Sequence, residues 1–66
     1  MTEEEIVQVR KLLHTVNNKV GAILATAEMM QMDQLPPKAT DRARVIESNA
    51  LELRDLVRQI GERYLK

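Results

Sequence analysis

Apolar residues recur along the first half of the chain at alternating steps of three and four. They fall at Ile6, Val9, Leu13, Val16, Val20, Ile23, Ala27 and Met30. This is the heptad pattern of a helix that packs against another helix, with the apolar residues alternating between positions a and d. At its start, Thr2 can cap the helix while Glu5 reaches back to it, and acidic residues suit the positive end of the helix dipole. The pattern predicts a helix over residues 3–32.

A second heptad pattern occupies the other half of the chain. It runs through Ala39, Ala43, Ile46, Ala50, Leu53, Val57, Ile60 and Tyr64. Between the two patterns, Pro36 and Pro37 cannot continue the first helix but can open the second. We therefore predict a turn over residues 33–37 and a second helix over 38–64. Because so short a turn makes the helices antiparallel neighbours, the expected fold is all-α, with residues 1–66 forming a single helical-hairpin domain.

The two patterns fit each other, yet they leave apolar surface uncovered. Folding the hairpin about residue 35 gives four apolar layers: Leu13 with Val57, Val16 with Leu53, Val20 with Ala50, and Ile23 with Ile46. Further leucines widen the apolar face beyond what one partner helix covers, namely Leu12, Leu24, Leu51 and Leu56. A chain of 66 residues also seldom buries enough apolar area to fold alone, and without cysteine it has no disulfide to help. We therefore expect a homodimer in which two hairpins form a four-helix bundle.

Composition excludes several function classes. The ten basic and ten acidic residues give zero formal net charge, which offers no support for nucleic-acid or anionic-membrane binding. No apolar run approaches the roughly 20 residues that a bilayer requires, and no signal peptide opens the chain. One histidine without any cysteine cannot make a zinc site. We expect a cytoplasmic protein with no metal site, no nucleic-acid partner and no membrane contact.

The only histidine, His14, takes position b, one step round the helix from Leu13 and turned toward solvent. A core histidine would occupy position a or d, so the remaining alternative is an idle surface histidine. Asn17 and Asn18 lie one turn further along, followed by Gly21. Asparagine is a poor helix former, and a helical glycine costs about 1 kcal/mol relative to alanine. Locally unfavourable residues beside the only imidazole indicate a candidate functional site.

The segment HTVNNKVGAI, which begins at His14, resembles the H-box of bacterial sensor histidine kinases in the form H-[E/D]-[I/L]-N-N-P-L-[A/G/T]-A-I. The segment RVIESNALELRDLVRQI resembles the second helix of the same domain. The resemblance covers nearly the whole chain and implies a dimerisation and histidine-phosphotransfer domain of a two-component system. It implies that His14 is the phosphoacceptor, which receives a phosphoryl group and passes it to, or takes it from, a response-regulator aspartate. It also implies that Asn18 positions the phosphoryl group or a water, and Asn17 matches the preceding asparagine of the motif.

Two departures from the family pattern matter for the chemistry. Thr15 replaces the acidic residue that in the family is the base for attack on ATP, and a threonine hydroxyl is a far weaker base. Lys19 stands where proline is usual. These departures bear on autophosphorylation more than on the capacity of His14 to accept or pass on a phosphoryl group.

The sequence contains no recognisable ATP site, because it has only two glycines and no glycine-rich phosphate loop. The chain is therefore expected to hold no cofactor itself, and ATP would be bound by a separate kinase domain in cis or in trans. The chain is expected to be either a fragment of a longer kinase or a stand-alone phosphorelay module, which leaves open whether it is itself an enzyme.

Charged residues near His14 are candidates for binding a response regulator. Arg10 and Lys11, one turn before His14, would favour added negative charge and an acidic regulator face. Three residues of the second helix are expected near His14 across the hairpin: Arg54, Asp55 and Arg58. For both sets, ordinary solvated surface charges are the alternative.

Two other functions remain open from the sequence. The first is a non-catalytic four-helix-bundle scaffold or interaction module that has lost phosphotransfer chemistry, for which Thr15 and Lys19 are the best support. The second is an unrelated antiparallel coiled coil that matches an H-box by chance. A downstream ATP-binding domain would favour the kinase, whereas a stop codon after Lys66 would favour a stand-alone module.

Overall fold

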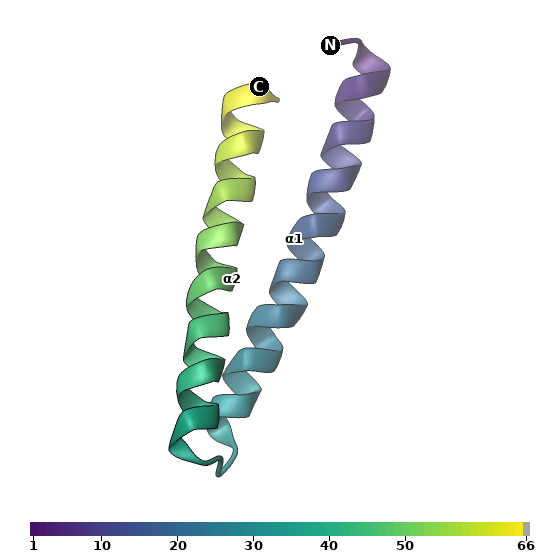
Figure 1. Ribbon diagram of the computed structural model, residues 1–66. Coiled ribbons are helices and arrows are strands. Elements are labelled where there is room, and N and C mark those ends of the chain that lie inside the picture. The colour runs from purple at the N-terminus through teal and green to yellow at the C-terminus, as the bar shows by residue number, and fades with distance from the viewer. Residues whose placement is uncertain (66) are drawn as a thin grey trace.

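The structure, a computed structural model that describes residues 1–65, consists of two long helices joined by a short turn (Figure 1). Helix α1 spans Glu3–Met32 and helix α2 spans Pro37–Tyr64. The second helix begins one residue earlier than predicted, because proline is well accommodated at the first position of a helix, where its missing N–H is not needed. The two helices pack against each other, which confirms the all-helical hairpin expected from the heptad patterns.

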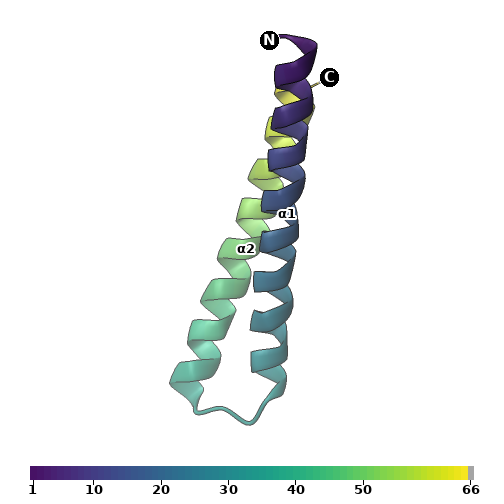
Figure 2. The same cartoon turned by 90° about the vertical axis from the view of Figure 1, so that its right-hand side faces the viewer.

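The hairpin is long and narrow, with extents of 51 × 16 × 12 Å. Both termini lie at the end opposite the turn, and two views at right angles show that the helices are inclined to one another (Figures 1 and 2). Within residues 1–65, neither helix is long and apolar enough to cross a membrane.

A capping box starts α1. The Thr2 hydroxyl oxygen accepts a hydrogen bond from the Glu5 backbone N–H at 3.1 Å. In return, the Glu5 carboxylate accepts one from the Thr2 backbone N–H at 3.2 Å and one from the Thr2 hydroxyl at 3.0 Å. These two bonds lower the pKa of Glu5 because both favour its ionised form, and the bond from the Thr2 backbone has the larger effect.

The capping box predicts a pH-dependent contribution to stability. Because the pKa of Glu5 is lowered by folding, its contribution is fully present above the pKa of the unfolded chain and is lost as the pH falls through the folded pKa. Glu5→Gln should therefore lower stability at about pH 6, and the difference from the wild type should vanish at about pH 2. Urea unfolding followed by circular dichroism measures both differences.

The matched control is Glu3→Gln, which removes a charge from the same helical turn but leaves the capping box intact. If the two variants lost the same stability at each pH, the hydrogen-bonded Glu5 carboxylate would have no special role.

The core between the helices is built from one heptad position. The buried residues are Val20, Ala27, Ala43 and Ala50, which are all at position a and are seven residues apart on each helix. Three of the four are alanines, whose small side chains let the helices approach closely. The hairpin by itself therefore buries little apolar volume.

Five of the d positions, by contrast, are not closed by the partner helix. They remain 41–48% exposed at Val16, Ile23, Ile46, Leu53 and Ile60. The expected layers of Val16 with Leu53 and of Ile23 with Ile46 are thus open at one side. The reason is geometric: position d lies about 60° round the helix from position a, so when a points at the partner helix, d points past it.

Four of these open d residues, namely Ile23, Ile46, Leu53 and Ile60, line two apolar grooves. The first groove, of about 260 Å³, is formed mainly by Ile23, Val45, Ile46 and Leu53, and a second continues from Leu53 along Leu56 and Ile60 toward Tyr64. We call the surface formed by these two grooves the open apolar face.

Candidate functional site

His14 is exposed on α1, as its position b predicted, and it lies at an open cleft of about 540 Å³ between the two helices. The cleft is lined by Leu13, His14 and Asn17 from α1 and by Arg54, Asp55, Val57, Arg58 and Gly61 from α2. Leu13 and Val57 are half-buried, whereas the polar side chains are exposed. The cleft therefore has an apolar base and a polar, charged rim.

The three α2 residues expected near His14 all lie at this cleft: Arg54, Asp55 and Arg58. They are brought there by the antiparallel register, which sets Leu13 and Val57 at the same level of the hairpin. Four other residues proposed from the sequence do not line it: Arg10, Lys11, Thr15 and Asn18.

The two asparagines are separated by the structure. Asn17 lines the cleft with His14, and Asn18 does not. Four residues of about 100° each bring Asn17 to within about 40° of the direction of Leu13, whereas Asn18 is turned a further 100° away from α2. Asn17 is thus the amide that lines the cleft with His14, while Asn18 lies one helical turn after His14 on the outer surface of α1.

Thr15 is engaged with the backbone of its own helix. Its hydroxyl donates a hydrogen bond to the Lys11 carbonyl oxygen at 3.0 Å, a common arrangement for threonine inside a helix. Its proton is thereby committed to the helix. Thr15 therefore supplies His14 with no carboxylate, and its hydroxyl hydrogen is used within α1.

Arg10 bridges the two helices at the open end of the hairpin. Its Nη2 donates to the Leu65 carbonyl oxygen at 3.0 Å, although the residues are 55 apart in the sequence. A cation at the C-terminal end of a helix is favoured by the helix dipole and satisfies a free carbonyl group. Arg10 therefore joins the ends of the chain in this structure, away from the cleft.

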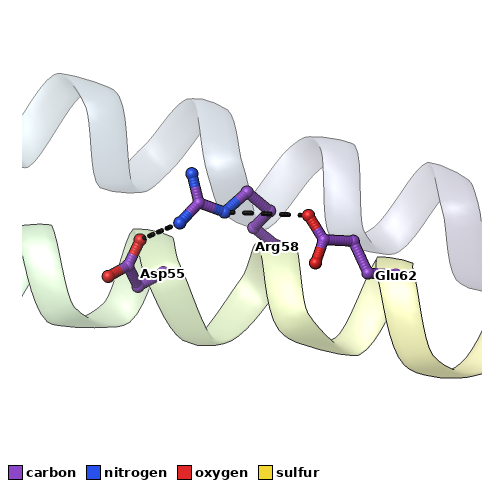
Figure 3. A network of polar contacts seen from close by, with 3 residues as sticks. All are labelled: Asp55, Arg58 and Glu62. Carbon is purple, nitrogen blue, oxygen red and sulfur yellow. Dashed lines mark hydrogen bonds and ion pairs between the residues drawn. The ribbon is translucent and has the colours of Figure 1, made fainter.

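Arg58 is held by two carboxylates of its own helix. Figure 3 shows its guanidinium between Asp55 and Glu62, with Nη2 at 2.7 Å from Asp55 Oδ1 and Nε at 3.9 Å from Glu62 Oε1. All three side chains are at least 60% exposed, so the pairs add little to stability. Glu62 was not predicted, although its opposite charge four residues after Arg58 is the spacing that would have indicated it.

The cleft and the open apolar face lie on different sides of the hairpin. The cleft residues occupy heptad positions a, b, e and f, while the grooves of the open apolar face occupy a, c, d and g. Only the central position a is shared. Another molecule covering the open apolar face would leave His14 accessible.

The cleft combines one imidazole, one amide, two guanidinium groups and one carboxylate. A neutral imidazole nitrogen on an exposed rim can attack an electrophile, and guanidinium groups bind phosphoryl oxygens in a planar, bidentate manner. Among residues 1–65 there is no group of three histidine, cysteine or acidic side chains that could hold a metal ion.

Removing the imidazole should hardly change stability. Because His14 is exposed, we expect His14→Ala to alter the free energy of unfolding by no more than about 0.5 kcal/mol, whereas Leu13→Ala, one residue away but half-buried, should cost about 2 kcal/mol. Urea denaturation of the two variants and the wild type measures both values. A loss of several kcal/mol in His14→Ala would mean that the histidine belongs to a core.

Comparison with known proteins adds no family assignment: the chain matches no protein-family model, no curated protein and no solved structure. The resemblance to the histidine-phosphotransfer domain therefore rests on the H-box-like segment and on the second-helix segment alone.

Proposed function

We propose that this chain is a phosphoacceptor domain of a two-component system, in which His14 exchanges a phosphoryl group with an aspartate of a response regulator. The observation that carries the proposal is the exposed imidazole at a cationic cleft on the side of the hairpin away from the open apolar face. A phosphoacceptor must be reached by more than one protein, and this placement leaves it accessible. The H-box-like sequence around His14 supports the same function.

In the proposed reaction, the neutral imidazole nitrogen of His14 attacks the phosphorus of an aspartyl phosphate. A phosphorus–nitrogen bond forms while the phosphorus–oxygen bond to the aspartate breaks, which returns the aspartate as a carboxylate, and the ring N–H proton passes to water. The same steps in reverse pass the phosphoryl group on. ATP enters only through a separate kinase domain, because this chain has no recognisable nucleotide-binding motif.

We further infer that a second copy of the chain covers the open apolar face, so that two hairpins form a four-helix bundle. This inference is supported by the heptad pattern on both helices and by d-position side chains that one partner helix leaves 41–48% exposed. Identical chains bury such a surface by symmetric, self-complementary packing. A bundle of this kind would place the two His14 clefts on its outside.

The experiment that tests the function starts from the whole chain phosphorylated on His14 by phosphoramidate, a small chemical donor. The labelled chain is mixed with receiver domains of response regulators from the same organism. We expect one or a few of them to remove the acid-labile label rapidly and to gain a base-labile aspartyl phosphate. His14→Ala, which has no other histidine to label, is the control. If the label left His14 equally slowly with and without every receiver, the proposal would be wrong.

A second candidate is a dimeric scaffold that keeps the bundle but exchanges no phosphoryl group. The observation in its favour is that the residue after His14 is Thr15, which is not an acid and whose hydroxyl donates to the Lys11 carbonyl of its own helix. This candidate predicts the same dimer and no transfer to any receiver.

A further inference from the structure

We propose that Arg58 binds the phosphoryl group of phosphorylated His14, and that it changes partners to do so, leaving Asp55 and Glu62 for the phosphoryl oxygens. Arg54 supplies a second positive charge at the same cleft. The inference rests on the proposed function of His14 and gives that site a charged binding partner from the other helix.

The charge of the cleft is too small to balance a phosphoryl group while Arg58 remains paired. Its lining holds two guanidinium groups, Arg54 and Arg58, and one carboxylate, Asp55. A phosphoryl group adds close to two negative charges at neutral pH. Arg54 forms no ion pair within residues 1–65, whereas Arg58 is occupied by Asp55 and Glu62. Compensating a dianion therefore requires Arg58 to be released as well.

The release of Arg58 is easy. Both ion pairs of Arg58 are exposed to solvent, and exposed pairs between neighbouring turns of a helix are weak and screened by salt. A bidentate bond from a guanidinium to a phosphoryl group is charge-assisted at both contacts and is stronger than either pair. The Arg58 side chain already lines the cleft of His14, so it can turn toward a phosphoryl group there without leaving the cleft.

An exchange of partners by Arg58 predicts the direction in which each substitution changes the rate of His14 phosphorylation. Because Asp55 competes with the phosphoryl group for Arg58, removing Asp55 should have the opposite effect to removing Arg58. A purely structural ion pair would behave differently, since breaking it from either side would have the same result.

The chain provides a matched control pair on the same helix. Arg44 and Asp41 have the same spacing as Arg58 and Asp55, with 3.7 Å between Arg44 Nη1 and Asp41 Oδ1, and the Arg44 side chain is 67% exposed, as is that of Arg58. Neither Arg44 nor Asp41 lines the cleft. Arg44→Gln and Asp41→Asn change the net charge of the chain by the same amounts as the corresponding substitutions at the cleft.

The experiment measures the rate at which phosphoramidate labels the whole chain. The neutral imidazole nitrogen of His14 bonds to phosphorus, the phosphorus–nitrogen bond of phosphoramidate breaks, and ammonia leaves with the proton released by the ring. We expect Arg58→Gln and Arg54→Gln each to slow labelling about fivefold, the effect of one nearby unit charge in water, and Asp55→Asn to accelerate it by a similar factor. Arg44→Gln and Asp41→Asn should leave the rate unchanged.

Two further measurements isolate the exchange. In the Arg58→Gln background, Asp55→Asn should lose most of its accelerating effect, because the residue for which it competes is gone. Phosphorylation should also move the Nε–H resonance of Arg58 in the NMR spectrum and leave that of Arg44 in place. Circular dichroism of each variant verifies that the helices remain.

The outcomes separate this inference from the proposed function. Equal labelling rates in Arg58→Gln and Arg44→Gln, or an Arg58 resonance that does not move, would overturn the role of Arg58, even if receivers still accept the phosphoryl group. Conversely, the expected rates without transfer to any receiver would support the binding role of Arg58 and overturn the response-regulator function alone.

Discussion

Leu53→Lys should separate the two hairpins of the proposed dimer, whereas Leu51→Lys should leave them together. The two leucines are a matched pair, because they are 43% and 40% exposed in the single hairpin. They differ in position: Leu53 lines both grooves of the open apolar face, and Leu51 lines neither. A lysine at Leu53 would bury an unpaired charge in the bundle, which should weaken association by about 3 kcal/mol or more, or roughly 100-fold in Kd.

Analytical ultracentrifugation at micromolar concentration measures the effect. The wild type and Leu51→Lys should sediment at twice the chain mass of 7.6 kDa, and Leu53→Lys should sediment as the single chain. A wild type that is a folded monomer, or two variants that dissociate equally, would show that the open apolar face is not the contact between copies.

Helix content should fall together with the dimer. Within residues 1–65 of one hairpin, the buried apolar residues are one valine and three alanines, namely Val20, Ala27, Ala43 and Ala50. So small a core seldom outweighs the conformational entropy of a chain of this length. We therefore expect folding and association to be coupled, so that the melting temperature rises with protein concentration.

The helices and their turn could be predicted from the sequence because the signals are local. The three-four spacing, the Thr2–Glu5 capping box and the Pro36–Pro37 pair each report on a few neighbouring residues. What the spacing could not decide is whether position a or position d faces the partner helix, since both are apolar. Residue size could have indicated which position faces the partner helix, because alanines gather at position a, where the helices meet, and larger side chains gather at d.

The rotation of α1 about its axis likewise decides the neighbours of His14. Its exposure, and the three α2 residues near it, follow from heptad position and register. That Asn17 lines the cleft and Asn18 does not follows only once position a is known to point at α2. Side-chain hydrogen bonds such as that from Arg10 to Leu65 depend on rotamers, which no spacing in the sequence indicates.

Thr15→Glu should raise the rate at which a separate kinase ATP-binding domain phosphorylates His14, by about 10²-fold if the missing carboxylate is the general base of that step. In the wild type the Thr15 hydroxyl donates to the Lys11 carbonyl and offers the imidazole no acid. Losing this bond should not disturb the helix, because Glu is a better helix former than Thr. Transfer from a phosphorylated response regulator needs only an accessible neutral imidazole, so its rate should change much less.

Acid-labile label on the wild type, Thr15→Glu, Thr15→Gln and His14→Ala measures both reactions with each donor in turn. Thr15→Gln is the matched control, since it has nearly the shape of glutamate without its basicity. A gain with glutamate but not with glutamine, confined to the ATP-dependent reaction, would identify the lost step as proton removal. Equal ATP-dependent rates in the two variants would mean that no acid is needed beside His14. A wild type and Thr15→Glu that take no label from either donor, although a regulator binds them, would point to the scaffold, because the fold and the exposed imidazole would then be present without phosphotransfer.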